Sequence, residues 1–486
     1  MNVNVLSYSV RMRVVLRYFG ELCLVLAVLT SIPLGVAFYF GEYCIGWRYL
    51  LTVVALGALG ALLNRLREPK HVQANEGMVI VALIFFFAPL VTAYPFMASG
   101  LNFVDALFET ISGITTTGLS TVGDIGRAPK TLLFARSWMQ WYGGLGIMAL
   151  SLALILEPSG ITKGLGVMES QDDDLVGGLR AHARRILVVY GTLTAASVVF
   201  LWAAGMDWFN SVVYSLAAVS TGGFAPHNTS LSGLGNEFTQ AAVIFVCFLG
   251  AVPLVLYYAL YERKFRSNVN SLQLQALLIS SIIMSILLFL SMKNSAGLPW
   301  SQLLYHASLL AFSGQTTAGF STLPLTDLSA GSKGILMLAM AIGGGAGSTA
   351  GGFKILRLLI FFQLLKLLVQ RTCLAPHAFV EPRLAGRRIS DTEQSATLVL
   401  ILLFFATVAW SWLIFLFMGY DALDSLFEVV SATSTVGLST GITSAELPTS
   451  LKSVLCIDML LGRLEFLAWI VVLNPRTWLG PRLEER

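Results

Sequence analysis

Long apolar stretches alternate with short polar linkers along almost the whole chain. Ten of these stretches are about 18 residues or longer, which is enough for an α-helix to cross the hydrocarbon core of a bilayer. We therefore predict an all-α polytopic membrane protein. The predicted spans cover residues 18–40, 47–64, 77–98, 131–156, 185–204, 239–261, 272–291, 332–369, 396–418 and 450–472.

Four shorter apolar segments lie between these spans, and each ends in the same kind of tetrapeptide. Segments such as 103–115 and 421–434 are too short to cross a bilayer, so we expect them to be re-entrant. Each tetrapeptide follows the pattern Thr-x-Gly-Leu/Phe. The four copies are Thr116-Thr117-Gly118-Leu119, Thr221-Gly222-Gly223-Phe224, Thr317-Ala318-Gly319-Phe320 and Thr435-Val436-Gly437-Leu438.

The repetition extends upstream of each tetrapeptide, in register with its glycine. Six positions before the glycine stand the small residues Ser112, Ala217, Ser313 and Ser431. Thirteen positions before it stand Asp105, Asn210, His306 and Asp424. The first and last copies match best, because Leu107-Phe108-Glu109 and Leu426-Phe427-Glu428 hold the same register. The repeated unit is therefore a whole subdomain, far longer than a solenoid repeat.

This pattern predicts an extra pair of spans followed by four units of span, re-entrant segment and span. The four units are expected to surround one ion pore with pseudo-fourfold symmetry. The predicted boundaries are 1–70 for the N-terminal two-helix unit, then 71–165, 166–265, 266–392 and 393–486 for the pore units.

Composition supports a membrane location, since 56% of the residues are hydrophobic and only 12% are charged, about half the charge of a soluble domain. Nothing indicates nucleic-acid binding, and the five isolated cysteines indicate neither disulfides nor a zinc site. The first apolar run is too long for a signal-peptide core, so it is interpreted as the first membrane anchor.

Lysine and arginine positions predict the orientation. The loops on the side shared by both termini are rich in basic residues and the opposite loops are poor in them, which predicts cytoplasmic termini and outward-facing tetrapeptides. The basic side carries Arg65, Arg67, Lys70, Lys163, Arg180, Arg184, Arg185, Arg263, Lys264, Arg266, Arg371, Arg383, Arg387 and Arg388, and the other side mainly Arg127, Lys130, Lys293, Lys333 and Lys452.

The tetrapeptides have the chemistry of a cation filter. Rings of backbone carbonyls can replace the hydration shell of a cation without fixed charge. Glycine permits the unusual dihedrals that such a ring needs, and threonine adds a hydroxyl. The C-terminal end of each half-helix also favours a cation. The alternative is that these glycines only let membrane helices pack closely.

A glycine-rich run interrupts the long apolar stretch of the third unit. It reads Gly343-Gly344-Gly345-Ala346-Gly347-Ser348-Thr349-Ala350-Gly351-Gly352. Each glycine costs a helix about 1 kcal/mol relative to alanine, so we predict a broken helix whose middle forms a gating loop beneath the filter. The alternative is close helix packing. A dinucleotide fingerprint at Gly345, Gly347 and Ala350 is excluded, because its flanks are membrane-like rather than a soluble βαβ unit.

Three basic residues sit in apolar sequence: Lys354 and Arg357 just after this run, and Arg463 deep in the last predicted span. We expect Arg463 to hold the loop by its carbonyls or to repel cations near the gate; pairing with Asp458 or Glu465 is the alternative. Lys354 and Arg357 follow the loop, and snorkelling at a helix end is an alternative for both. Charged groups within a membrane usually face a cavity or a partner.

Two other features leave alternatives open. Asp105, Glu109, Asp424 and Glu428 are candidates for the relay of a proton- or sodium-coupled symporter, or else for helix N-terminal capping. The acidic run Gln171-Asp172-Asp173-Asp174 is either a solvated loop or a docking surface for a cytoplasmic partner. A polytopic membrane enzyme is disfavoured, because no catalytic constellation stands out.

Taken together, these motifs resemble a known family. The four tetrapeptides and the 343–352 run with Phe353-Lys354 are similar to the TrkH/TrkG branch of the Trk, Ktr and HKT potassium transporters. So are the segments Gln140-Trp141-Tyr142-Gly143-Gly144-Leu145-Gly146 and Met459-Leu460-Leu461-Gly462-Arg463-Leu464-Glu465. The resemblance covers nearly the whole chain, including the extra N-terminal pair.

The resemblance implies a homodimer in the bacterial inner membrane with one pore per subunit and K⁺ as the transported ion. It implies that residues 343–352 form an intramembrane gating loop and that Arg463 lies nearby. It also implies a TrkA-like cytoplasmic ring that binds the regulatory nucleotide, so no nucleotide site is expected in this chain. All four filter positions are glycine, without the serine of sodium-favouring relatives. The position just before the filter glycine differs in the second copy, which has Gly222 where the others have Thr117, Ala318 and Val436.

Overall fold

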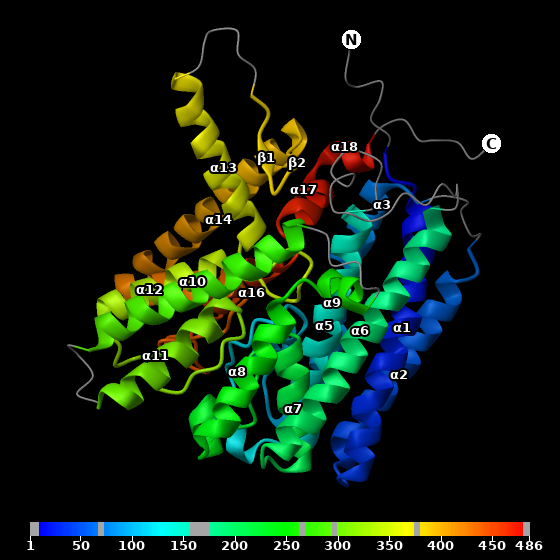
Figure 1. Ribbon diagram of the computed structural model, residues 1–486. Helices are drawn as coiled ribbons and strands as arrows, with labels where there is room; N and C mark the ends of the chain where they lie inside the picture. Colours follow the sequence, from blue (N-terminus) through cyan, green and yellow to red (C-terminus); the bar gives the residue numbers. More distant parts are fainter. Residues whose placement is uncertain are drawn as a thin grey trace.

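The computed structural model describes residues 9–66, 72–155, 175–261, 268–293, 299–373 and 380–479. The described chain is mostly helical (Figure 1). The acidic run at residues 171–174 lies outside the described residues. So do Arg67, Lys70, Lys163, Arg263, Lys264 and Arg266.

The N-terminal pair consists of α1 (Met12–Tyr39) and α2 (Tyr43–Leu63), which pack as a hairpin against α3 (Ala74–Phe96). Two glycines let the hairpin close tightly, since a Cβ added to Gly60 would lie 2.8 Å from the carbonyl oxygen of Gly20. Such small-residue contacts are typical of helices packed within membranes.

Four units follow, each with a first span, a half-length pore helix and a second span. The first spans are α3, α6 (Leu175–Ala203), α10 (Asn268–Met292) and α14 (Asp391–Phe417). The pore helices are α4 (Phe103–Ile114), α7 (Trp208–Val219), α11 (Trp300–Gln315) and α15 (Ala422–Thr433). The second spans begin with α5 (Lys130–Ile155), α8 (Glu237–Ala251), α12 (Ala330–Ile342) and α16 (Thr449–Arg463).

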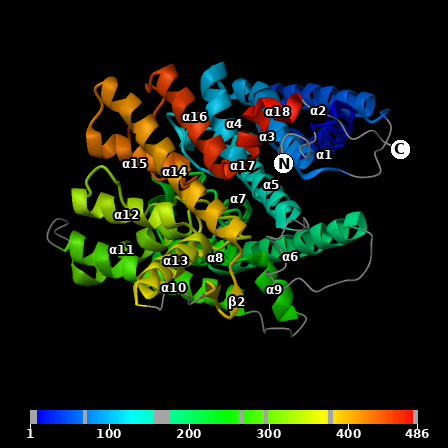
Figure 2. The ribbon, with the colours of Figure 1, turned by 90° about the horizontal axis from the view of Figure 1, so that it is seen from above.

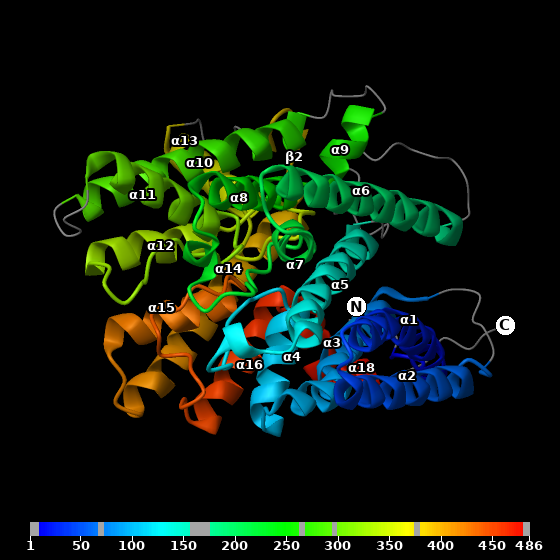
Figure 3. The ribbon, with the colours of Figure 1, turned by 90° about the horizontal axis from the view of Figure 1, so that it is seen from below.

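The units form a closed ring. Each second span packs on the pore helix of the next unit: α5 on α7, α8 on α11, α12 on α15, and α16 back on α4. Views along the axis from both ends show the four units around a common centre, with α1 and α2 outside beside α3 (Figures 2 and 3). The predicted pseudo-fourfold arrangement is therefore present in the fold.

Three of the four second spans are broken near mid-length, whereas only the break in the third unit was predicted. In unit two, α8 ends at Ala251 and α9 (Leu254–Tyr261) follows Pro253, because proline lacks an N–H and clashes with the preceding turn. In unit three, residues 343–354 separate α12 from α13 (Ile355–Thr372), as expected. The expected spans 239–261 and 450–472 are thus wrong as continuous helices.

The break in unit four has a different cause. Between α16 and α17 (Leu467–Leu473) the backbone takes positive φ at Glu465 (51°) and Phe466 (62°). Neither residue is a glycine or proline, so no local sequence signal marks the turn. A prediction from local sequence fails where tertiary contacts determine the backbone.

Short elements complete the described chain. A hairpin of two-residue strands, β1 (Arg383–Leu384) and β2 (Arg387–Arg388), pairs antiparallel between α13 and α14 and was not predicted. It lies at the same end of the molecule as α18 (Pro475–Trp478) (Figure 1). The 3₁₀ turns are η2 (Met97–Ser99), η3 (Ile125–Arg127) and η4 (Ser230–Leu234).

Six described helices are long and apolar enough to cross a membrane: α1, α2, α3 and parts or all of α6, α10 and α14. The second spans α8, α12 and α16 fall short because they contain only 15, 13 and 15 residues. Each relies on the segment after its break to extend it. Interrupted helices at membrane depth are tolerated where the freed backbone groups are buried in protein or line a cavity.

Candidate functional site

The four Thr-x-Gly segments adopt one repeated backbone conformation directly after their pore helices. The threonine two positions before each filter glycine has φ of 52° at Thr116, 51° at Thr221, 54° at Thr317 and 52° at Thr435. The glycines themselves have φ of 96°, 83°, 68° and 94° at Gly118, Gly223, Gly319 and Gly437. Left-handed backbone at a residue with a side chain costs about 1–3 kcal/mol, and such strain gathers at functional sites.

The same hydrogen bond recurs behind each segment. The N–H before the filter glycine donates to the carbonyl six positions before that glycine, at 2.9, 2.7, 3.0 and 2.9 Å for Thr117, Gly222, Ala318 and Val436. In the first and last copies the glycine N–H also donates to a serine hydroxyl, Ser112 or Ser431, at 3.0 Å. The repeat of small residues six positions before each glycine therefore corresponds to the same backbone hydrogen bond in all four units.

The segments also meet one another in a circle. A Cβ added to any of the four filter glycines would collide with the backbone carbonyl just before the filter glycine of the next unit. The colliding pairs are Gly118 with Gly222, Gly223 with Ala318, Gly319 with Val436, and Gly437 with Thr117. The four carbonyls therefore form one closed ring, which only glycine can line at these positions.

A second set of four glycines recurs at one position of the second spans, and sequence reasoning missed this register although Gly143, Gly343 and Gly462 lie within its motifs. The fourteenth position counted from the start of α5, α8, α12 and α16 is glycine in every unit: Gly143, Gly250, Gly343 and Gly462. Added Cβ atoms at Gly143, Gly250 and Gly462 would collide with the carbonyls that end the pore helices, at Ile114, Val219 and Thr433. Their nearly constant spacing after the filter glycines was a signal that could have found them.

An open cavity of about 550 Å³ lies on one side of the ring. All four filter glycines line it, together with the loops that follow them and with Arg136. The run 343–352 does not line this cavity. The ring therefore has a wide vestibule on one face and the glycine-rich run on the other.

The glycine-rich run is hydrogen-bonded to residues of units two, three and four on the face of the ring away from the cavity. The Thr349 hydroxyl shares its one proton between the carbonyls of Val219 (3.1 Å) and Gly250 (3.0 Å) in unit two. The Gly351 N–H donates to the Thr317 hydroxyl at 2.7 Å. The Gly352 N–H donates to the carbonyl of Ser434, next to Thr435, at 3.0 Å. The run is thus a loop, as the sequence predicted, and it lies beside the Thr-x-Gly segments.

Arg463 reaches the same run from the end of α16. Its side chain is buried, and its guanidinium donates to the Thr349 carbonyl at 2.8 Å. The expected hold on loop carbonyls is therefore present. The alternative, a salt bridge from Arg463 to Asp458 or Glu465, is absent. Asp458 accepts from the Ser411 hydroxyl at 2.7 Å, and Glu465 pairs with other basic side chains.

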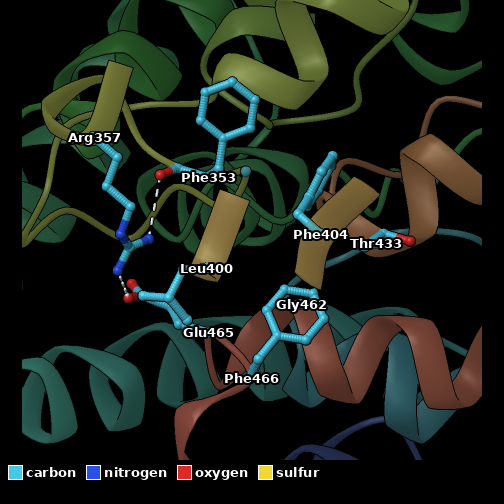
Figure 4. A pocket seen from close by; sticks show the side chains of 9 residues that line it. Phe353, Arg357, Leu400, Phe404, Thr433, Gly462, Glu465 and Phe466 are labelled. Atoms are coloured by element: carbon cyan, nitrogen blue, oxygen red, sulfur yellow. Dashed lines mark hydrogen bonds and ion pairs between the residues drawn. The ribbon is translucent and has the colours of Figure 1, made fainter. Parts of the chain in front are cut away.

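Lys354 and Arg357 converge on Glu465, so the snorkelling alternative is wrong for both. Lys354, which has φ of 70° at the end of the loop, pairs with Glu465 at 3.3 Å and is buried. Arg357 pairs with Glu465 and donates to the Phe353 carbonyl at 3.2 Å. Figure 4 shows Arg357 between Phe353 and Glu465, beside a small pocket. This triad joins the loop exit to the bend between α16 and α17.

The four carboxylates of the pore helices are all committed to other groups. Asp424 pairs with Lys333 and Asp105 with Lys452, both at 2.6 Å and both between neighbouring units. Glu109 pairs with Arg136 at 3.0 Å. Glu428 accepts hydrogen bonds from the hydroxyls of Ser439, Thr440 and Thr443 and from the Thr440 N–H. These bonds fix the loops that follow the Thr-x-Gly segments and the order of the units.

Lys452→Met is expected to destabilise the protein by about 3–5 kcal/mol, because it leaves the buried Asp105 carboxylate unpaired. The measurement is the thermal unfolding midpoint in detergent. The double variant Asp105→Asn with Lys452→Met should recover part of the loss, since no buried charge remains. If the single variant unfolds at the wild-type temperature, the pair does not hold units four and one together.

Comparison with known proteins agrees with this geometry. Residues 48–477 match the model of the TrkH family, described as cation transport proteins. The chain is 28% identical over 462 residues to an uncharacterized cation transporter of Methanocaldococcus jannaschii, which covers 94% of each chain. It is 27% identical to the Trk system potassium uptake proteins TrkH of Halomonas elongata and TrkG of Escherichia coli. Each of these two alignments covers 96% of this chain, and they cover 99% of the TrkH protein and 98% of the TrkG protein.

The fold agrees as well. The crystal structure of the potassium transporter TrkH from Vibrio parahaemolyticus matches with a TM-score of 0.85 at 24% sequence identity, over 97% of this chain and all of that one, 100%. Family and fold are those of a transporter rather than an enzyme, and the long apolar helices make it a multi-pass membrane protein. The resemblance carried by the tetrapeptides is thus confirmed, and the chain belongs to the TrkH family of cation transport proteins.

Proposed function

We propose that this protein takes up K⁺ through one gated pore per chain, with the carbonyl ring as its selectivity filter. The observation that carries the proposal is the closed ring itself, in which four left-handed Thr-x-Gly segments abut one another in sequence. Such a ring offers several carbonyl oxygens to a dehydrated monovalent cation. Potassium is favoured because all four positions are glycine and because the named relatives are potassium uptake proteins.

The run 343–352 is proposed to be the gate. Its hydrogen bonds to Val219, Thr317 and Ser434 hold it against the inner face of the filter. Arg463 would act in two ways, by anchoring the Thr349 carbonyl and by placing a positive charge on the cation path. Lys354 and Arg357 would fix the exit of the loop through Glu465. Opening then requires the loop to leave these partners.

The wider assembly is proposed from the resemblance and from charge. A homodimer in the bacterial inner membrane would be controlled by a TrkA-like cytoplasmic ring that binds the nucleotide. The hairpin with Arg383, Arg387 and Arg388 and the helix α18 with Arg476 share one end of the molecule (Figure 1), which supports placing that end in the cytoplasm. The domain boundaries given for the four pore units are part of the same proposal.

A coupled symporter on this scaffold receives less support than a channel-like pore. Asp105 and Asp424 are held by lysines, Glu109 by Arg136, and Glu428 by three hydroxyls. A relay needs groups that exchange protons or ions along the path, and these four carboxylates are instead engaged in fixed bonds between loops and units.

The decisive test is growth of a potassium-uptake-deficient bacterium on low-potassium medium. Expression of the chain should restore growth, and the purified protein in liposomes should carry rubidium faster than sodium. A Gly319→Ala variant, whose Cβ collides with the Val436 carbonyl, should carry rubidium and sodium with a lower flux ratio than the wild type. Failure of a correctly inserted wild-type protein to restore growth or to carry rubidium would refute the proposal. Adding the regulatory ring with and without nucleotide then tests regulation.

A further inference from the structure

Gln140 opens the segment 140–146 on α5. Its side chain is fully buried and crosses from unit one to the filter segment of unit two. The Nε2 atom donates to the carbonyl of Gly222 at 2.5 Å, and the Oε1 atom accepts from the Phe224 N–H at 3.2 Å. Because a backbone N–H can only donate, this pair of bonds fixes the orientation of the amide.

The same contact explains the one irregular residue of the fourfold motif. The position before the filter glycine is Thr117, Ala318 or Val436 in three copies, but Gly222 in the second. A Cβ added to Gly222 would collide with the amide of Gln140. The absent side chain therefore makes room for Gln140, and the two residues form a matched pair across the boundary between units.

The ring is consequently asymmetric at one carbonyl. The Gly222 carbonyl, which meets Gly118 in the ring, carries a side-chain donor. Within the described ranges, the carbonyls of Thr117, Ala318 and Val436 have no side-chain donor of this kind. The eleventh residues of the other second spans, which correspond to Gln140, are Cys247, Met340 and Met459. None of these side chains offers an amide.

We propose that Gln140 is a positioning residue for ion selectivity, acting through the Gly222 carbonyl. The hydrogen bond draws electron density from that oxygen and fixes it in place, which lowers the field that one quarter of the ring exerts on the cation. A weaker carbonyl field favours K⁺ over the smaller, more tightly hydrated Na⁺. The proposal rests on the proposed filter function and names the residue pair that tunes it.

The first test replaces Gln140 by methionine, the residue found at the corresponding positions of units three and four. Gln140→Met frees the Gly222 carbonyl, so the ratio of rubidium to sodium flux in liposomes should fall about five- to tenfold, the scale of one lost hydrogen bond. Met340→Leu, at the matching place in unit three, controls for repacking and should keep the wild-type ratio. An unchanged ratio in Gln140→Met overturns the proposal.

Gln140→Glu separates hydrogen bonding from packing, because the two side chains have nearly the same shape. An ionised carboxylate still accepts from the Phe224 N–H but cannot donate to the Gly222 carbonyl. Protonation restores a donor. The selectivity of Gln140→Glu should therefore be low at neutral pH and rise as the pH falls, while the wild-type ratio stays flat over the same range. A merely structural role predicts no such pH profile, and its absence would refute the hydrogen-bond mechanism.

A third test changes Gly222, the residue whose carbonyl Gln140 binds. Gly222→Ala should displace the amide and lower the flux ratio as Gln140→Met does. The double variant should lose no more than either single variant, because both remove one bond; fully additive losses would contradict the pairing. These outcomes are distinct from failure of the function itself. If the wild type carries no rubidium, the pore proposal fails; if it does and the Gln140 variants match it, only the present inference fails.

Discussion

Replacing Gly118 or Gly437 with serine is expected to remove most of the discrimination between K⁺ and Na⁺. Both glycines have φ above 90°, a conformation that disfavours any Cβ. The new Cβ would also meet the neighbouring carbonyl, that of Gly222 for Gly118 and that of Thr117 for Gly437. Since the ring must shift to accept either change, its carbonyls can no longer match one ion size.

We expect the ratio of rubidium to sodium flux to fall by about tenfold or more, which corresponds to about 1.4 kcal/mol of lost discrimination. Gly123→Ser is the matched control, because Gly123 lies in the loop after the first filter segment and an added Cβ there meets nothing within 4 Å. Wild-type flux ratios in folded Gly118→Ser and Gly437→Ser proteins would show that these residues do not form the filter.

Deleting Gly347-Ser348-Thr349 is expected to raise flux in the absence of the regulatory ring by about tenfold or more. The deletion removes the Thr349 hydroxyl, which binds unit two, and the Thr349 carbonyl, which binds Arg463. Each buried hydrogen bond contributes about 0.5–1.5 kcal/mol, so losing both shifts the equilibrium away from the closed state. The measurement is basal rubidium flux in liposomes, normalised to the amount of folded protein.

Arg463→Ala should move the same equilibrium without shortening the loop, and should also remove a positive charge from the path. Arg463→Lys keeps the charge and should restore part of the closure, although an ammonium cannot reproduce the geometry of a guanidinium. Single-channel recording gives the open probability directly. A deletion protein that assembles but conducts no better than wild type would leave the run 343–352 as packing rather than a gate.

The sequence pattern correctly predicted features that depend only on residues close together in the chain. The half-length of the pore segments, the register of Ser112 with Ser431, and the cost of six glycines in a helix were all readable in the sequence. Each follows from chain length, side-chain size or backbone propensity within a short window. The helix break at Pro253 could also have been predicted from the proline alone. It was missed because the apolar run around Pro253 is long enough for one continuous span.

Features that depend on distant contacts could not be predicted in this way. Arg463 had two nearby acids in sequence, yet its partner is a carbonyl 114 positions away. The left-handed turn at Glu465 and Phe466 contains no glycine or proline, and is accompanied by an ion triad with Lys354 and Arg357. Gln140 stood in a recognised motif, but its role depends on Gly222, 82 positions away.

The closed ring has a consequence for how the protein is made. Its last contacts join the final unit to the first: Gly437 against Thr117, α16 against α4, and Lys452 with Asp105 across 347 positions of sequence. A chain emerging from the ribosome therefore inserts three units before any of these bonds can form. Until the fourth unit arrives, Asp105 lacks its lysine and Gly118-Leu119 borders an open seam. The ring proposed to select the ion is thus completed only in the final stage of synthesis, and a chain that stops early leaves a gap where the ring would close.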